Sequence, residues 1–300
     1  MDDNRKTAPP AQSLAALWLP ATFVILWSTG FIFGKLGLPH AGPATFLSIR
    51  YLIVIALLTL LALAMSAPWP KREQIVPIAI AGLFVHAGYL GGVFGSISVG
   101  VEAGVSALVA GLQPVVTAAL AGPFLGEKVT ARQWAGLALG VVGVVLVIHT
   151  KLGLGLGTPF GMALSAFAML SLTIGTLWQK RYCAGMDLRT GSVVQFIASL
   201  IVTAPLAFLL EGFRVEWAPN FIIAMAWLCV VLSIVTISAM FVLIRRGKAA
   251  EVASLFFLVP PTTAIIAWFM FGERVEAISM VGMVLVAAAV AMVTWKPRGR

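Results

Sequence analysis

The sequence predicts an all-α integral membrane protein, in which ten transmembrane helices form two inverted five-helix repeats around a central cavity. Three observations support this fold class. Of the 300 residues, 60% are hydrophobic and only 10% are charged, whereas soluble domains average about 25% charged residues. The hydrophobic residues gather in ten segments that are long enough to cross a bilayer. The second half of the chain also repeats landmarks of the first half.

The ten apolar segments are expected to be membrane-spanning helices. A helix rises 1.5 Å per residue, so about 20 apolar residues cross the hydrocarbon core. The first segment is too long for a signal peptide and no small-residue cleavage site follows it, so it is expected to be retained. Gly, Pro and charged residues fill the short connections. The expected spans are 14–36, 43–66, 75–97, 101–123, 131–149, 158–180, 191–211, 219–244, 250–271 and 276–295.

The distribution of Lys and Arg predicts that both termini are cytoplasmic. With the N-terminus inside, 15 of the 20 basic residues fall on the cytoplasmic side, which is the usual bias of cytoplasmic loops. Four fall outside, and Arg50 lies within the second span. The net charge of +9 therefore reflects membrane topology. No nucleic-acid partner is expected, because the basic residues form no continuous face.

An internal repeat relates two stretches of the chain that lie 146 positions apart. Chance matches are frequent in apolar sequence, but here Pro, Gly-Glu and Gly landmarks stay in register. Each half holds five spans, an odd number, so the second half is expected to enter the membrane in the opposite orientation, as in many transporters. The matched residues are Pro114 and Pro260, Thr117 and Thr263, Ala118 and Ala264, Ala121 and Ala267, Gly126-Glu127 and Gly272-Glu273, Gly136 and Gly282, and Leu139 and Leu285.

The repeat also predicts the domain organisation. The first repeat covers 14–149, a linker covers 150–157 and the second repeat covers 158–295, with cytoplasmic tails at 1–13 and 296–300. Pro114 is expected to remove the hydrogen bond to Ala110, and Pro260 with Pro261 those to Phe256 and Phe257. Such kinks face protein or a watery cavity. They either shape the cavity or serve only helix packing.

Three sequence motifs resemble those of EamA-type members of the drug/metabolite transporter superfamily. They are LWSTGFIFGK in the first span, LGEKVTARQWAGLALGVVGVVLV at the first repeat turn and FGERVEAISMVGMVLV at the second. Within the superfamily the chain is most similar to YddG-type exporters of aromatic and other neutral amino acids. The resemblance covers nearly the whole chain. It implies a basket-like bundle with a central cavity and export across a bacterial inner membrane.

Several function classes are excluded by missing motifs. The chain has no GxxxxGK[ST] loop for ATP, no nucleophile–base arrangement and no metal-ligand spacing; its cysteines, Cys183 and Cys229, are isolated. We therefore expect a gradient-driven transporter that is not an enzyme and that needs no cofactor or metal. A multidrug or other metabolite exporter on the same scaffold is the first alternative. A membrane-embedded enzyme or a scaffold without transport is the second.

The charges of the spans predict a small neutral substrate, above all an amino acid. All 11 acidic residues lie in tails, loops or the end turns of spans, whereas an organic-cation exchanger needs a buried anion. A nucleotide-sugar carrier needs several buried cations. Only Arg50 lies well within a span, and it is expected to snorkel toward the outer surface. Without a central carboxylate, transport is expected to be uncoupled, or coupled at most through His86.

Five side chains are candidates for substrate binding. His86 lies near the middle of the third span and shares a helix face with Tyr89. Its imidazole can bind a substrate carboxylate or titrate, or it can simply bind a carbonyl of a neighbouring helix. Separately, Gly136, Gly140 and Gly143 favour helix packing within one bundle over a dimer face, so a monomer or homodimer is expected. The candidate substrate-binding residues are His86, Tyr89, Trp27, Gln113 and Trp178.

Overall fold

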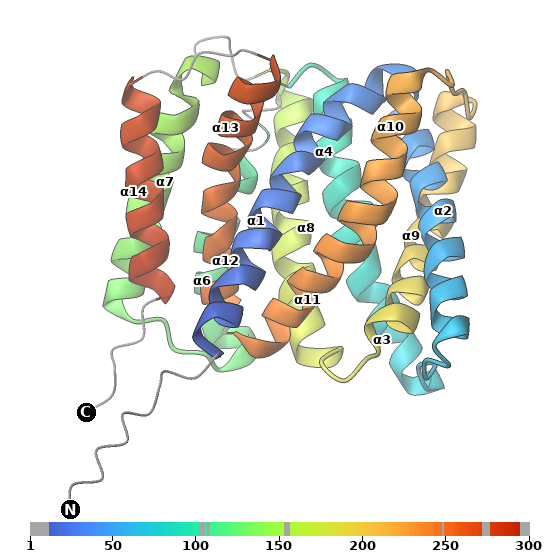
Figure 1. Cartoon of the computed structure of the whole chain (residues 1–300), viewed down its shortest axis with the longest axis horizontal. Coiled ribbons are helices and arrows are strands. Elements are labelled where there is room, and N and C mark those ends of the chain that lie inside the picture. The colour runs from blue at the N-terminus through green and yellow to red at the C-terminus, as the bar shows by residue number, and fades with distance from the viewer. Residues whose placement is uncertain are drawn as a thin grey trace, which may run out of the picture.

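The computed structural model describes residues 12–101, 106, 109–152, 157–247, 249–271 and 277–294. Residues 1–11 of the expected N-terminal tail, the expected C-terminal tail, part of the linker and the Gly272-Glu273 turn lie outside these ranges. The helices stand side by side as one bundle (Figure 1). They are α1 (Gln12–Gly37), η1 (Leu38–His40), α2 (Pro43–Ala64), α3 (Arg72–Gly82), η2 (Leu83–Gly88), α4 (Tyr89–Ser98), α6 (Gln113–Leu125), α7 (Ala131–Leu152), α8 (Pro159–Tyr182), α9 (Leu188–Glu211), α10 (Pro219–Trp227), η3 (Leu228–Thr236), α11 (Ile237–Arg246), α12 (Ala249–Ser254), η4 (Leu255–Leu258), α13 (Val259–Phe271) and α14 (Ala277–Thr294).

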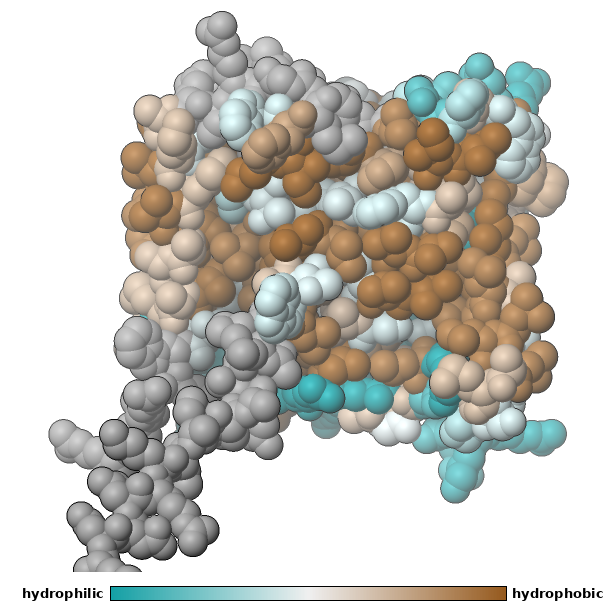
Figure 2. Space-filling view, viewed as in Figure 1, coloured by the Kyte–Doolittle hydropathy of each residue, from teal (hydrophilic) through white to brown (hydrophobic). Residues whose placement is uncertain are grey.

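The outer surface of the bundle is apolar. Figure 2 shows a mostly hydrophobic face with hydrophilic residues gathered near its upper and lower edges, and many Leu, Ile, Phe and Trp side chains are exposed. Within the described residues, seven helical stretches are long and apolar enough to cross a membrane, and three apolar helices are shorter. The fold is therefore that of a multi-pass membrane protein, whereas the count of ten spans stays a prediction. The seven stretches are Trp18–His40, Pro43–Ala64, Arg72–Ser98, Pro159–Tyr182, Leu188–Glu211, Pro219–Arg246 and Ala277–Thr294, and the shorter helices are Gln113–Leu125, Ala131–Val147 and Ala249–Thr263.

The two halves of the chain interlock, because helices of the first half pack mainly against helices of the second. The principal pairs are α7 with α14, α2 with α9, α4 with α8, and α1 with α13 and α10. Gly136 of α7 faces Ala289 and Val293 of α14, whereas Gly143 faces Gly282 and Val286. Moving forward along α7 thus means moving backward along α14. These equivalent helices are antiparallel, as an inverted repeat requires, and the glycines pack within the bundle.

Two helices of each half are interrupted at matching places. The π-helical segments η2 and η3 lie in the middle of α3–α4 and of α10–α11. A turn at residues 111–112 precedes α6, and the 3-10 segment η4 precedes α13. Pro114 therefore lies in the first turn of α6, where its missing N–H is not needed, and Pro260 and Pro261 open α13 in the same way. The expected kinks thus take the form of a turn before α6 and of a 3-10 segment inside the helical stretch Ala249–Thr263.

Candidate functional site

Two open depressions lie at opposite ends of the bundle and are built from equivalent loops. The upper vestibule, of about 750 Å³, is lined by residues 38–43, 97–98 and 214–216. The lower vestibule, of about 610 Å³, is lined by Pro68, residues 185–189, Ser238 and Arg245. Each combines the loop after the first long helix of one half with the loop after the second long helix of the other. The inverted repeat thus gives each end of the bundle a similar entrance.

Contacts between the two halves lie at and beside the upper vestibule. The Glu211 carboxylate at the end of α9 accepts hydrogen bonds from the backbone N–H groups of Ala44 (2.9 Å) and Thr45 (2.7 Å) at the start of α2. Ala41 and Val215 form an antiparallel β-bridge. A negative side chain at a helix N-terminus is favourable because that end carries partial positive charge. These contacts hold α2 and α9 together at this end.

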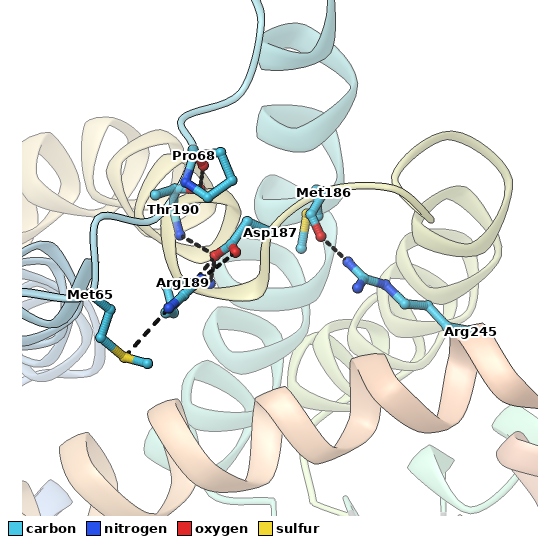
Figure 3. A network of polar contacts seen from close by, with 7 residues as sticks. All are labelled: Met65, Pro68, Met186, Asp187, Arg189, Thr190 and Arg245. Atoms are coloured by element: carbon cyan, nitrogen blue, oxygen red, sulfur yellow. Dashed lines mark hydrogen bonds and ion pairs between the residues drawn. The ribbon is translucent and has the colours of Figure 1, made fainter. Parts of the chain in front are cut away.

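A polar network surrounds the lower vestibule (Figure 3). Asp187 caps the start of α9 and pairs with Arg189, with 2.7 Å between Oδ2 and Nη2. This hydrogen bond lowers the pKa of the Asp187 carboxyl. The Thr190 hydroxyl donates to the Pro68 carbonyl at 2.7 Å, and Arg245 donates to the Met186 carbonyl. The loop after α2, the loop after α8 and the end of α11 are therefore tied together.

Glu127 ties the turn after α6 to the second half of the chain. Its carboxylate forms an ion pair with Lys180 at the end of α8, with 2.6 Å between Oε1 and Nζ. The other carboxylate oxygen accepts a hydrogen bond from the backbone N–H of Ala249 at 2.9 Å. Ala249 begins α12, so the negative charge also lies at a helix N-terminus. The sequence interpretation placed Glu127 at a helix end, and the structure puts that helix in the opposite half.

Between the vestibules, the described residues line two small cavities. A cavity of about 30 Å³ lies between α1, α2, α4 and η3, and its lining includes Trp27, Arg50, Tyr89 and Leu232. The Trp27 and Tyr89 rings stack with centroids 6.0 Å apart, and Phe256 meets Trp27 edge-on at 5.1 Å. Binding pockets for small molecules usually measure about 300 Å³ or more. This conformation is therefore closed around its interior.

Arg50 corrects the sequence prediction that its side chain reaches the outer surface. The side chain is only 2% exposed, because α2 packs between α9 and η3 and leaves no route to solvent. Its Nε donates a hydrogen bond to the Ser233 hydroxyl at 2.9 Å, whereas Nη1 has no hydrogen-bond partner. Ser233 also bonds to the carbonyl five residues earlier, which fits the π-helical turn. Sequence analysis missed Ser233 because a lone Ser in an apolar span carries no signal.

The five predicted site residues lie in different surroundings. Trp27 and Tyr89 line the 30 Å³ cavity together. Gln113 is buried beside Phe256 and lines a second cavity of about 10 Å³. His86 stacks on Phe196, with centroids 4.1 Å apart, and neither ring nitrogen has a hydrogen-bond partner. Trp178 donates from Nε1 to the Pro77 carbonyl at 3.0 Å, away from both cavities.

The family model and the named relatives that match this chain are those of transporters and exporters. The model of the EamA-like transporter family matches residues 14–149 and 159–295. A probable amino-acid metabolite efflux pump of Salmonella typhimurium is 26% identical and covers 90% of this chain and 92% of its own. A probable terminal-alkyne amino-acid exporter of Streptantibioticus cattleyicolor is 24% identical, covering 95% of both chains. A solved crystal structure with 17% identity has a TM-score of 0.77 over 94% of this chain and 96% of its own.

Proposed function

The chain belongs to the EamA-like transporter family, and from this premise we propose that it exports small neutral metabolites, above all aromatic and other neutral amino acids, by alternating access. It is a membrane transporter and not an enzyme. The observation that carries the proposal is the pair of equivalent vestibules with a closed interior between them. A carrier must open to one side at a time, and an inverted repeat places an equivalent entrance at each end of the bundle.

The membrane arrangement we propose has ten spans in two inverted five-helix repeats, covering 14–149 and 158–295, with the lower end in the cytoplasm. Basic residues support this orientation. Arg72, Lys128, Arg181 and Arg246 lie at helix ends or loops of the lower side, whereas Arg214 lies at the upper side. Export then means that substrate enters through the lower vestibule and leaves through the upper one. The start of α1 and the end of α14 both lie at the lower side (Figure 1).

The proposed substrate site lies between the halves, and its lining supports an uncharged or zwitterionic substrate. Trp27 and Tyr89 would contact the substrate side chain, with Gln113, His86 and Trp178 as further candidates. Within the described residues, no carboxylate lines either interior cavity, so organic cations have no buried counter-charge there. The names of the two relatives, an amino-acid metabolite efflux pump and an amino-acid exporter, point to the same substrate class.

Counterflow tests the proposed function directly. Purified protein in liposomes loaded with unlabelled neutral amino acids should accumulate the labelled compound transiently, and protein-free liposomes should not. Repeating the assay with an imposed pH gradient tests coupling. We propose uncoupled flux, or coupling through His86, so any gradient dependence should disappear in His86→Gln. Flux of cationic dyes without amino-acid flux would favour a multidrug exporter, and absence of all flux would favour a scaffold.

A further inference from the structure

Among the described residues, Arg50 is a buried charge without a matching anion. Its side chain lines the cavity beside Trp27 and Tyr89, and its Nη1 makes no hydrogen bond. The acidic residues among the described positions all lie at helix ends or in loops, and none forms an ion pair with it. Removing a guanidinium from water is strongly unfavourable unless it is paired. The missing partner is therefore expected to come from outside the chain.

The fold itself does not require a charge at this position, because the other half builds the same position without one. Aligning the buried positions of α2 with those of α9 pairs Arg50 with Gln195 and Tyr51 with Phe196. The backbone contacts agree with this alignment. The Cys229 thiol donates to the Arg50 carbonyl, and in the other half a Cβ placed on Gly82 would lie 2.5 Å from Gln195 Cα.

The side-chain partners of the two positions are also equivalent. Arg50 contacts Ser233 in the π-helical segment η3, and Phe196, the residue after Gln195, stacks on His86 in the π-helical segment η2. Gln195 further donates to Gln179 at 2.7 Å. One half thus holds a neutral amide, whose Nε2 is bonded to Gln179 and whose Oε1 has no partner, while the other half holds a guanidinium whose Nη1 has no partner. A charged side chain therefore stands at only one of the two equivalent positions. Packing does not require this charge, whereas a binding site for an anion does.

We propose that Arg50 binds the carboxylate of the transported substrate, with Trp27 and Tyr89 as the wall for its apolar side chain. This inference deepens the proposed function, because it uses the same cavity. Guanidinium and carboxylate form charge-assisted hydrogen bonds. Ser233 holds Nε, and Nη1 remains for the ligand. No acidic side chain lines the cavity among the described residues. The carboxylate is therefore required, and the amino group of the substrate contributes less.

The test compares 3-phenylpropionate with 3-phenylpropionamide, which differ only in replacing the carboxylate by an amide. Both compete against labelled phenylalanine in counterflow, and both are tested for raising the melting temperature of the detergent-solubilised protein. We expect the amide to compete roughly ten-fold or more weakly, the factor that one hydrogen bond to a charged group supplies. Arg50→Gln should abolish this difference. Arg50→Lys should retain it in part, because the charge remains but the planar fork is lost.

Gln195→Ala is the matched control, since it changes the equivalent position of the other half and should leave the preference for the carboxylate unchanged. Arg50→Gln copies the residue that the other half already holds there, and its elution profile and melting temperature check that it folds. Equal competition by acid and amide, or a preference that survives in Arg50→Gln, would overturn the inference. If no amino acid is transported but 3-phenylpropionate shows Arg50-dependent counterflow, the proposal that the substrate is an amino acid fails. The inference that Arg50 binds the substrate carboxylate then stands. If 3-phenylpropionate neither competes, moves nor stabilises, the inference fails.

Discussion

At the scale of single residues, glycines set how closely the helices of the two halves approach. Gly91 and Gly92 are neighbours in α4 and face different surroundings. A Cβ on Gly92 would lie 2.8 Å from both the Ala168 Cβ and the Leu164 carbonyl oxygen of α8, whereas a Cβ on Gly91 would have nothing within 4 Å. Contacts with backbone atoms cannot be relieved by a side-chain rotation. The pair therefore separates the effect of helix propensity from the effect of packing.

We expect Gly92→Ala to destabilise the protein and Gly91→Ala to leave it unchanged or slightly more stable. Overpacking costs about 1–3 kcal/mol, while Ala favours a helix over Gly by about 1 kcal/mol. Thermal unfolding in detergent, followed by loss of the monodisperse peak, measures both variants. Equal melting temperatures of Gly92→Ala and Gly91→Ala would mean that α4 does not approach α8 closely at Gly92.

At the scale of elements, the turn after α6 acts as a connector between the halves through Glu127. Glu127→Gln removes the ion pair with Lys180 but keeps an acceptor for the Ala249 N–H, whereas Glu127→Ala removes both. We expect both variants to be destabilised. The free energy of unfolding of Glu127→Ala should be lower than that of Glu127→Gln by about 1 kcal/mol, the usual contribution of a helix cap. Melting temperatures of the two variants test this order.

Lys180→Ala completes a double-mutant cycle with Glu127→Gln. Because the two side chains are in direct contact at 2.6 Å, their effects should not add. Additive losses would show that the ion pair contributes nothing by itself, which is common for exposed pairs. Both side chains here are mostly buried, at 19% and 16% exposure, so coupling is expected.

At the same scale, the sequence predicted the helical elements better than their interruptions. Apolar length fixes where a helix crosses the bilayer, and the limits expected for the spans of α2, α8 and α9 agree with the structure within a few residues. The π-helical segments, the turn before Pro114 and the 3-10 segment before Pro260 could not be read from the sequence. Proline marks both a kink and the first turn of a helix, and only the neighbouring helices decide between them.

For the candidate site, the sequence linked Tyr89 to His86 through a shared helix face, whereas the structure brings Tyr89 together with Trp27 at one cavity whose lining does not include His86. Arg50 was misplaced because its distance from the span end suits snorkelling, and only the packing of α2 against α9 and η3 removes that route. Equivalence between the halves was visible in the motifs around Pro114 and Pro260. The pairing of Arg50 with Gln195 was not, because their side chains differ and only burial aligns them.

At the scale of the whole molecule, the two halves are in contact at both ends of the bundle, and the cavities described between those ends are small. We propose that this is an occluded state of the transport cycle. A cycle needs the halves to separate at one end while the other end stays closed. At the upper end the β-bridge between Ala41 and Val215 must then open for release. The Glu216 N–H also donates to the His40 carbonyl there at 2.8 Å. A covalent link at this bridge should therefore stop transport.

We expect the double variant Ala41→Cys, Val215→Cys to form a disulfide that abolishes flux until a reductant restores it. Antiparallel neighbours place their Cα atoms about 4.5–5.5 Å apart, which lies within the range that a disulfide spans. The native Cys183 and Cys229 are free and buried, so the engineered pair is the accessible one. Each single variant is the control and should transport with or without oxidant. Undiminished flux in the fully oxidised double variant would show that the upper vestibule does not lie on the export path, because the bridge cannot open while the disulfide holds.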